Sequence, residues 1–388
     1  MYFCRQYFIC TLPGFGPAHK TMSDPLLYQI ALTMAPHVGA VTAKILVSYC
    51  GSPEAVFRSK PQALHRIPGI GPSIASGLFS KGLLEKAELE REWIEKRQIS
   101  VLFYTDSQYP FRLKQNADCP ALLYFKGSDS ALVNAERIVG IVGTRQPTEQ
   151  GRALCEAFVE ELQAYGVVVL SGLAFGIDGV AHQKANALGM PNLGALGHGL
   201  GTLYPREHHG IAQKMLEHGG LLTEYAHDVR PDREHFPMRN RIIAGLSDAL
   251  LVVETAQTGG SMITAELAVQ YDRDVFAVPG RVRDAKSAGC NRLIRLNKAR
   301  LTESAADLTE EMGWVPSGQR KAVQAALFVD LTGEEESLLK QVQLRPEIGI
   351  DELSYDVSLP PGRIASLLLS LEFKGLVRAL PGKRYVIV

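Results

Sequence analysis

Short apolar runs alternate with longer mixed segments through the middle of the chain, from Arg137 to about Met312. Each run is rich in Val, Leu or Ile, and the segment between one run and the next is long enough to form a helix. This alternation is typical of βαβ units, in which parallel strands are buried under helices on both faces. The runs are Ile138–Val142, Val167–Leu170, Leu193–Leu196, Leu221–Thr223, Ala249–Val253 and Val275–Val278. The pattern predicts an α/β core with a Rossmann-like, doubly wound, mostly parallel sheet.

The chain before this core has a helical pattern with short segments and many turn signals, which predicts an N-terminal helical domain of helix-hairpin-helix or SAM-like type. Its segment Ile67–Ala75 contains Gly69 and Gly71 and resembles the hairpin of a helix-hairpin-helix motif, in which glycine amides approach a DNA phosphate. An ordinary Pro-Gly loop between packed helices is the alternative. A charged helix and two strands, Ser100–Tyr104 and Ala121–Phe125, then lead into the core.

The order of elements after the core is helix, helix, helix and hairpin, which is the order of a winged helix. The predicted helices are Gly333–Val342, Ile350–Val357 and Pro361–Phe373, and the hairpin covers 375–387. The predicted organisation is therefore a disordered or misassigned extension (1–22), a helical domain (23–98), a Rossmann-like core (99–314), a linker (315–332) and a winged-helix domain (333–388).

Composition limits the classes of function. The chain has 388 residues, with Lys+Arg and Asp+Glu both at 41, so a nucleic-acid surface would have to come from locally gathered charge. The six cysteines are scattered without zinc-ligand spacing, which fits a reducing cytoplasm and predicts no metal site. No apolar run approaches the roughly 20 residues of a membrane span, so we expect a soluble, cytoplasmic protein without a membrane partner.

Four glycine-rich segments follow predicted strands, and all of them fall at the carboxyl edge of the sheet, where such folds bind ligands. In the first, Gly143 allows a tight turn, Thr144 offers a hydroxyl, and Arg145 can fork onto phosphate oxygens. Thr148 is the expected N-cap of the following helix, whose N-terminus favours an anion. The alternative is a glycine turn with an ordinary surface arginine.

The other three segments extend the predicted phosphate site. They contribute Ser171, Gly172, Phe175 and Gly176; Arg239, Asn240 and Arg241; and Gly259, Gly260 and Ser261. Two arginines in the first turn of a helix oppose its dipole, which an anionic ligand would compensate, although they could also be solvated surface residues. Phe175 is either a core anchor or a stacking surface for a base. Asp178 is expected to hold its loop rather than to act in catalysis.

Several signals of enzymes are missing from the sequence. No G-x-x-x-x-G-K-[ST] phosphate loop is present, and the segment Gly197–Gly201 lacks the G-x-G-x-x-G spacing of dinucleotide sites. The histidines have no partner at metal-ligand spacing. We therefore expect a non-catalytic protein without a cofactor.

The motif set resembles the DNA-processing protein A family, also called DprA or Smf, in order and spacing from about Tyr109 to Met312. The shared motifs are Gly143-Thr144-Arg145, Ser171–Ala174 with Gly176-Ile177-Asp178, Tyr204-Pro205, Phe236–Arg241 and Gly259–Ala265. The resemblance implies a single-stranded DNA-binding protein that protects incoming DNA and loads the RecA recombinase in natural transformation. It also implies a homodimer formed through the Rossmann-like domain. Phe175 stands where relatives often carry a lysine, and His208-His209 where asparagine is commoner.

Two other functions compete with this one. Rossmann-like phosphoribohydrolases of the lysine-decarboxylase-like family carry a related Gly-Gly segment with a Thr and a Glu, similar to Gly259-Gly260, Thr264 and Glu266. A winged-helix regulator of transcription is the other, because the last segment gathers basic residues. These are Arg363, Lys374, Arg378, Lys383 and Arg384.

Overall fold

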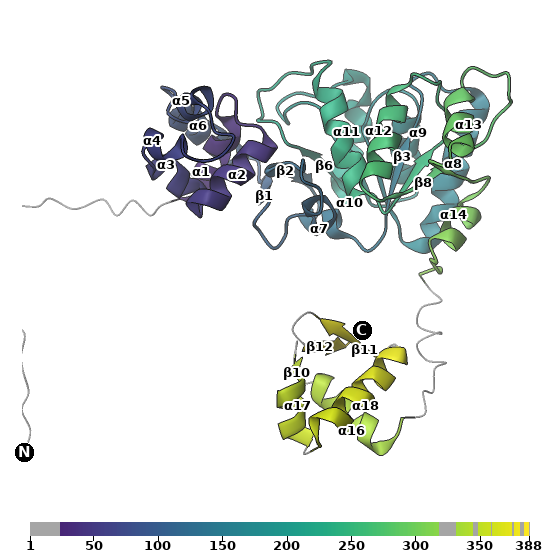
Figure 1. The fold of residues 1–388 in the computed structure, drawn as a ribbon. Coiled ribbons are helices and arrows are strands. Elements are labelled where there is room, and N and C mark those ends of the chain that lie inside the picture. The colour runs from purple at the N-terminus through teal and green to yellow at the C-terminus, as the bar shows by residue number, and fades with distance from the viewer. Residues whose placement is uncertain are drawn as a thin grey trace, which may run out of the picture. The chain divides into compact units, whose positions relative to one another are not determined.

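The computed structural model describes residues 24–317, 331–343, 348–357, 359–374, 376–380 and 384–387 (Figure 1). The chain divides into two compact units, with the boundary between Ser317 and Gly318. The predicted extension and most of the predicted linker lie outside the described residues. Within the described part of the chain, no helix is both long and apolar enough to cross a membrane.

The first unit begins with a cluster of short helices beside the first two strands (Figure 1). The helices are α1 Pro25–Met34, α2 Ala40–Cys50, α3 Pro53–Arg58, α4 Pro61–Leu64, α5 Pro72–Leu78 and α6 Leu83–Glu95. Asp24 and Ser52 cap α1 and α3 with their side chains, and proline opens both helices. The hairpin glycine Gly69 has a positive φ of 82°, and neither it nor Gly71 has an atom near the position of a Cβ. The hairpin is therefore open to solvent, and its contact with DNA stays a prediction.

These helices share one hydrophobic core with the start of the sheet. Ile30, Leu46 and Ile94 of the helices pack in the same cluster as Phe103 and Leu122 of the strands. The apolar residues of this helical region are thus buried against the sheet, and both belong to one compact unit.

A nine-stranded sheet forms the centre of the first unit, in the order β1-β2-β6-β5-β4-β3-β7-β8-β9. The strands are β1 Ser100–Phe103, β2 Leu122–Gly127, β3 Ile138–Val142, β4 Val168–Ser171, β5 Asn192–Ala195, β6 Gly220–Thr223, β7 Ala249–Val252, β8 Asp274–Ala277 and β9 Arg300–Leu301. Strands β3 to β9 pair in parallel, and the hairpin β1-β2 adds antiparallel to β6. The predicted fold class is confirmed, although β9 is too short to stand out in the sequence.

Helices cover both faces of this sheet. The bounds are α7 Phe111–Lys114, α8 Glu149–Leu162, α9 Ile177–Ala187, α10 His209–His218, α11 His235–Leu246, α12 Gly260–Gln270, α13 Ala288–Arg295 and α14 Ala305–Glu311. Along β3, Ile138 and Val142 pack in the core with α11, α12 and α13, whereas Val139 and Ile141 pack with α8, α9 and α14. This alternation with period two is what a strand buried on both faces requires.

The strand order reverses at β3, because β4 lies on one side of it and β7 on the other. The loops that leave the carboxyl ends of β3 and β7 therefore turn to opposite faces of the sheet. In doubly wound folds the crevice between two such loops is the usual ligand position.

The second unit has the elements of a winged helix. They are α16 Gly333–Gln343, β10 Ile348–Gly349, α17 Ile350–Val357, α18 Pro361–Phe373, β11 Val377–Leu380 and β12 Arg384–Ile387. The strands form an antiparallel sheet in the order β10-β12-β11. Leu338, Ile364, Leu368 and Leu371 make its core. The predicted winged helix is confirmed, and only the two-residue β10 was absent from the sequence pattern.

Candidate nucleic-acid interface

A cavity of about 730 Å³ lies at the point where the strand order reverses. We call it the switch-point cavity. Its lining comprises Val142, Gly143, Thr144, Arg145, Ala174, Asp178, Tyr204, Arg233, Phe236, Pro237, Arg239, Asn240, Ile243, Thr255, Ala256, Gly259, Gly260, Ser261, Ile263 and Thr264. The structure thus brings together eight of the thirteen predicted site residues, from the first, third and fourth glycine-rich or arginine-bearing segments.

Arg145 and Arg233 supply exposed positive charge to this cavity. The Arg145 guanidinium lies 5.6 Å from the centre of the Phe236 ring, which holds it over the cavity by a cation–π contact. Neither arginine has a carboxylate partner in the part of the chain that the structure describes. Both guanidinium groups are therefore available to an anionic ligand.

The N-terminus of α8, which the sequence predicts as a phosphate site, contacts a carboxylate of the chain itself. The buried carboxylate of Glu254 accepts hydrogen bonds from the Thr148 amide (3.2 Å) and the Thr148 hydroxyl (2.7 Å). The Thr144 amide donates to the Glu254 carbonyl at 2.6 Å. Thr148 is the N-cap as predicted, and the Glu254 carboxylate holds this N-cap residue in place from the loop after β7.

The loop after β4 is organised in the same way by Asp178. Its carboxylate accepts from the amides of Gly172 (3.1 Å) and Ala174 (3.4 Å), which confirms the expectation that Asp178 holds the loop. Burial raises the pKa of this carboxyl group, while the charge of Arg239 opposes that shift. Ser171 is fully buried and donates its hydroxyl to the Ile141 carbonyl at 2.6 Å, so it lies behind the cavity rather than in it.

Arg239 lies beneath the cavity, and Gly172 makes room for it. A Cβ at Gly172 would stand 1.8 Å from the Arg239 Nη1 atom. That nitrogen donates to the Ala195 carbonyl at 2.7 Å, and the side chain is only 3% exposed. Burial lowers the pKa of Arg239 to about 10. The guanidinium is therefore a cation fixed under the cavity floor, still charged at neutral pH.

The structure separates Arg241 from this group. Its guanidinium pairs with Glu224 and its Nε donates to the Met238 carbonyl at 3.1 Å. Successive residues on a helix point about 100° apart, so two residues separated by one position point to nearly opposite sides of the helix. Arg239 and Arg241 therefore cannot both face the cavity. We therefore leave Arg241 out of the proposed interface, while Asn240 lines the cavity as predicted.

The N-terminus of α12 is open to the cavity. Gly259 is its N-cap and supplies no capping side chain, and a Cβ at Gly260 would meet no atom. The Ser261 hydroxyl donates to the Thr255 hydroxyl at 2.6 Å. Uncapped backbone amides at a helix N-terminus attract phosphate, so this segment is the anion site that the geometry favours.

Phe175 and Gly176 line a smaller adjacent cavity of about 420 Å³, which they share with Arg145, Arg152 and His208. Phe175 is 38% exposed and packs edge-on against the His208 ring at 5.3 Å, so it is not a core anchor. The interpretation as a stacking surface for a base stays a prediction. Gly176 has φ of 82°, and a Cβ there would stand 2.2 Å from the Thr144 carbonyl oxygen.

The structure adds Arg233 to the site, together with Tyr204 and Phe236, which the sequence placed in family motifs but not among the predicted site residues. Tyr204 is 43% exposed and its ring packs against Phe236 with centroids 5.8 Å apart. Aromatic residues inside polar segments were the available signal, since such side chains in a phosphate site can stack on bases.

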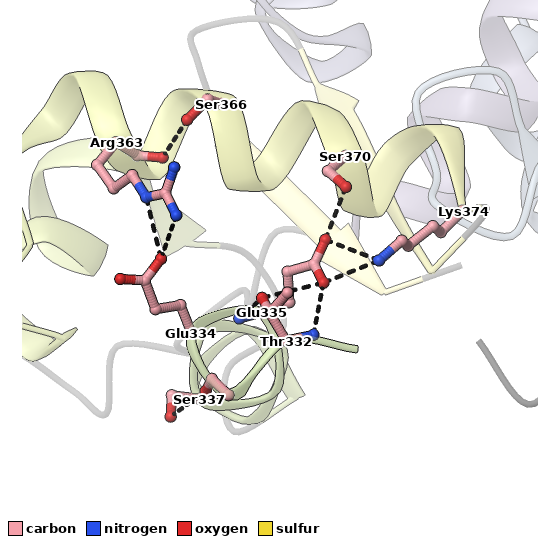
Figure 2. A network of polar contacts seen from close by, with 9 residues as sticks. Thr332, Glu334, Glu335, Ser337, Arg363, Ser366, Ser370 and Lys374 are labelled. Carbon is pink, nitrogen blue, oxygen red and sulfur yellow. Dashed lines mark hydrogen bonds and ion pairs between the residues drawn. The ribbon is translucent and has the colours of Figure 1, made fainter. Parts of the chain in front are cut away.

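The winged helix offers a weaker candidate surface, because two of its five predicted basic residues, Arg363 and Lys374, form ion pairs with glutamates (Figure 2). Arg363 donates to Glu334 through Nε (2.9 Å) and Nη2 (2.6 Å), and Lys374 donates to both oxygens of Glu335 at 2.8 Å. Arg378 is exposed on β11. Lys383 and the side chain of Arg384 lie outside the described residues. Helix α18 instead exposes apolar Leu369 (53%) and Phe373 (86%).

The same network predicts how the winged helix responds to acid. Hydrogen bonds from Lys374, Ser370 and Thr332 lower the pKa of Glu335 to about 2. Because the folded state favours the carboxylate, the stability that Glu335 contributes is present above its unfolded pKa of about 4.3 and is lost as the pH falls toward 2. We expect amide exchange in α16 and α18, corrected for intrinsic rates, to accelerate across this window.

The control for that measurement is the neighbouring glutamate. Glu335→Gln should flatten the response, whereas Glu334→Gln should leave it, since Glu334 is the more exposed of the two, at 44% of its side chain. An identical response in both variants would contradict the assignment to Glu335.

Comparison with known proteins identifies similar chains. A family model described as DNA recombination-mediator protein A matches residues 100–313, and a model of the DprA winged helix domain matches residues 323–383. The DNA processing protein DprA of Bacillus subtilis is 41% identical over 214 residues, covering 55% of this chain and 71% of that protein. The X-ray structure of DprA from Streptococcus pneumoniae superposes with a TM-score of 0.62 at 28% identity, covering 74% of this chain and 96% of that one. A structure describing the single-stranded DNA binding mode of DprA from Helicobacter pylori superposes with a TM-score of 0.51 at 29% identity, covering 55% and 95%.

Proposed function

Because the chain belongs to the DNA recombination-mediator protein A family, we propose that it binds single-stranded DNA in the switch-point cavity. The observation that carries the proposal is the composition of that cavity. It gathers two exposed arginines, Arg145 and Arg233, the buried cation of Arg239 and the open N-terminus of α12. Phosphates of a flexible strand are the anions that such a surface fits. The similarity to the Helicobacter pylori protein supports this choice of ligand.

We further propose that the protein protects the bound strand and loads the RecA recombinase onto it during transformation or recombination. It would do so in the cytoplasm, as a homodimer formed through the Rossmann-like core. The description of the family as a recombination mediator supports this role.

The geometry gives a hydrolase little support. Glu266 does not line the switch-point cavity; its half-exposed side chain pairs with Lys298 at 3.3 Å on the outer face of α12. Asp178 is the one carboxylate in the lining, and its Oδ2 atom already accepts hydrogen bonds from two loop amides. The arrangement can hold phosphates, but it positions no free acid or base beside them.

The test is a comparison of single-stranded and duplex DNA of the same length by fluorescence anisotropy across a salt series. We expect preferential binding of the single strand, with a log–log salt slope of about −0.7 for each phosphate neutralised. A chain that ends at Ser317 should bind as well as the full chain, because the first unit is compact by itself and contains the cavity.

Two results would favour the competing functions. Loss of binding in the chain that ends at Ser317 would place the DNA site in the winged helix. Release of free base from nucleoside monophosphates, abolished by Glu266→Ala, would identify a phosphoribohydrolase.

A further inference from the structure

A second basic cavity lies beside the first, where the helical region meets the sheet. Its volume is about 780 Å³, and we call it the Trp93 cavity. Three segments form most of it: the end of α6, the loop 200–206 after β5 and the loop 227–231 after β6. Tyr204 lines both this cavity and the switch-point cavity. The two cavities are therefore neighbours that share an exposed aromatic ring.

The charge of the Trp93 cavity is strongly one-sided. Arg97, Lys126, Arg206 and Arg230 line it, against a single carboxylate, Asp228. None of the four cations forms an ion pair with another described residue. Because the whole chain has a formal net charge of zero, this gathering is a local excess that attracts anions.

The wall that carries Arg97 is held rigidly. The Arg97 guanidinium lies 4.3 Å from the centre of the Trp93 ring, which stacks on His227 with centroids 4.5 Å apart and an interplanar angle of 16°. The buried carboxylate of Glu90 accepts from the His227 amide at 2.9 Å and also contacts the His227 ring nitrogen. Helix α6 and the loop after β6 are thereby fastened together, which positions Arg97 at the wall of the cavity.

We propose that the Trp93 cavity binds the phosphates of the same single strand after it leaves the switch-point cavity past Tyr204. The inference rests on the proposed function and extends its site. Tyr204 is 43% exposed at the boundary, where it can stack on a base while the flanking arginines contact the backbone. The helical region would then bind DNA through α6, with a longer binding path than the sheet alone provides.

The experiment compares a short oligothymidine of about 6 nucleotides, sized for one cavity, with one of about 20 nucleotides, which can span both. The test variant is Arg97→Ala with Arg206→Ala, both exposed in the free protein. We expect it to bind the long strand about tenfold or more weakly, to reduce its salt slope by about 1.4, and to bind the short strand as the wild type does. The matched control is Lys60→Ala with Lys214→Ala, which removes two exposed cations that line neither cavity.

Tryptophan fluorescence gives an independent readout. The chain has two tryptophans, Trp93 and Trp314, so Trp314→Phe leaves Trp93 as the sole reporter. Its emission should change with the long strand and not with the short strand or with a free nucleotide.

The alternatives are separable. Equal weakening of both lengths, or a loss no greater than in the lysine control, would overturn the extended path. Saturable quenching of Trp93 by a free nucleotide would identify a separate nucleotide site and also overturn it. Failure of the wild type to bind either strand would instead remove the proposed function itself.

Discussion

Replacing Arg145 with alanine should lower the affinity for single-stranded DNA by about 10- to 100-fold. Arg145 is exposed in the switch-point cavity, lies over the Phe236 ring, and also lines the smaller adjacent cavity that contains Phe175. A hydrogen bond to a charged group contributes about 1.5–3 kcal/mol, which converts to this range of affinity. The salt slope should fall by about 0.7 if one phosphate contact is lost. Fluorescence anisotropy across a salt series measures both quantities.

Two control variants test whether the effect is specific to the Arg145 guanidinium. Arg145→Lys keeps the charge but loses the forked geometry, so an intermediate affinity is expected. Lys214→Ala removes an exposed cation of α10 that lines neither cavity and should leave binding unchanged. An Arg145→Ala protein that binds like the wild type would exclude Arg145 from the interface.

Replacing Arg239 with alanine should affect both stability and binding. The substitution removes the hydrogen bond to Ala195, opens a hole under the cavity and leaves the buried Asp178 carboxylate without the cation that favours its charged form. We expect a loss of about 3 kcal/mol in the free energy of unfolding. DNA affinity of the folded protein should also fall, because the amides that Asp178 holds belong to the cavity loop.

Arg241 is the matched control for this prediction, since it lies two residues away and is equally buried. Its partner Glu224 is outside the switch-point cavity, so Arg241→Ala should destabilise the protein without changing the affinity of the folded fraction. Urea unfolding, together with binding at a temperature where both variants are folded, separates the two effects. If Arg239→Ala changes stability alone, Arg239 acts only as a support for the fold.

The sequence predicted most of the fold because its signals are local. The predicted core strands, from Ile138–Val142 to Val275–Val278, were short β-branched or leucine-rich runs. The bounds of each agree with those of a strand in the sheet to within a residue or two. The helices of the winged helix were equally clear. Strands β9 and β10 were missed because two residues carry no periodicity.

The site was less predictable because its details depend on residues far apart in the chain. Glu254, whose carboxylate contacts the N-cap residue of α8, is 106 positions from Thr148, and no local pattern indicates that contact. Arg241 similarly forms an ion pair with Glu224, which lies 17 positions earlier in the chain. Arg239 and Arg241 look alike in the sequence, whereas in the structure they differ in their partners, the Ala195 carbonyl and the Glu224 carboxylate.

The brace that Glu254 forms between β7 and the start of α8 has a consequence for the speed of association. The loop from Gly143 to Thr148 is tied at both Thr144 and Thr148 before any ligand binds. We therefore expect that little loop entropy is lost when a strand binds to this loop. The association rate should then depend on diffusion and on the electrostatic field of the arginines. Lowering the ionic strength should therefore increase the association rate constant by a larger factor than it decreases the dissociation rate constant.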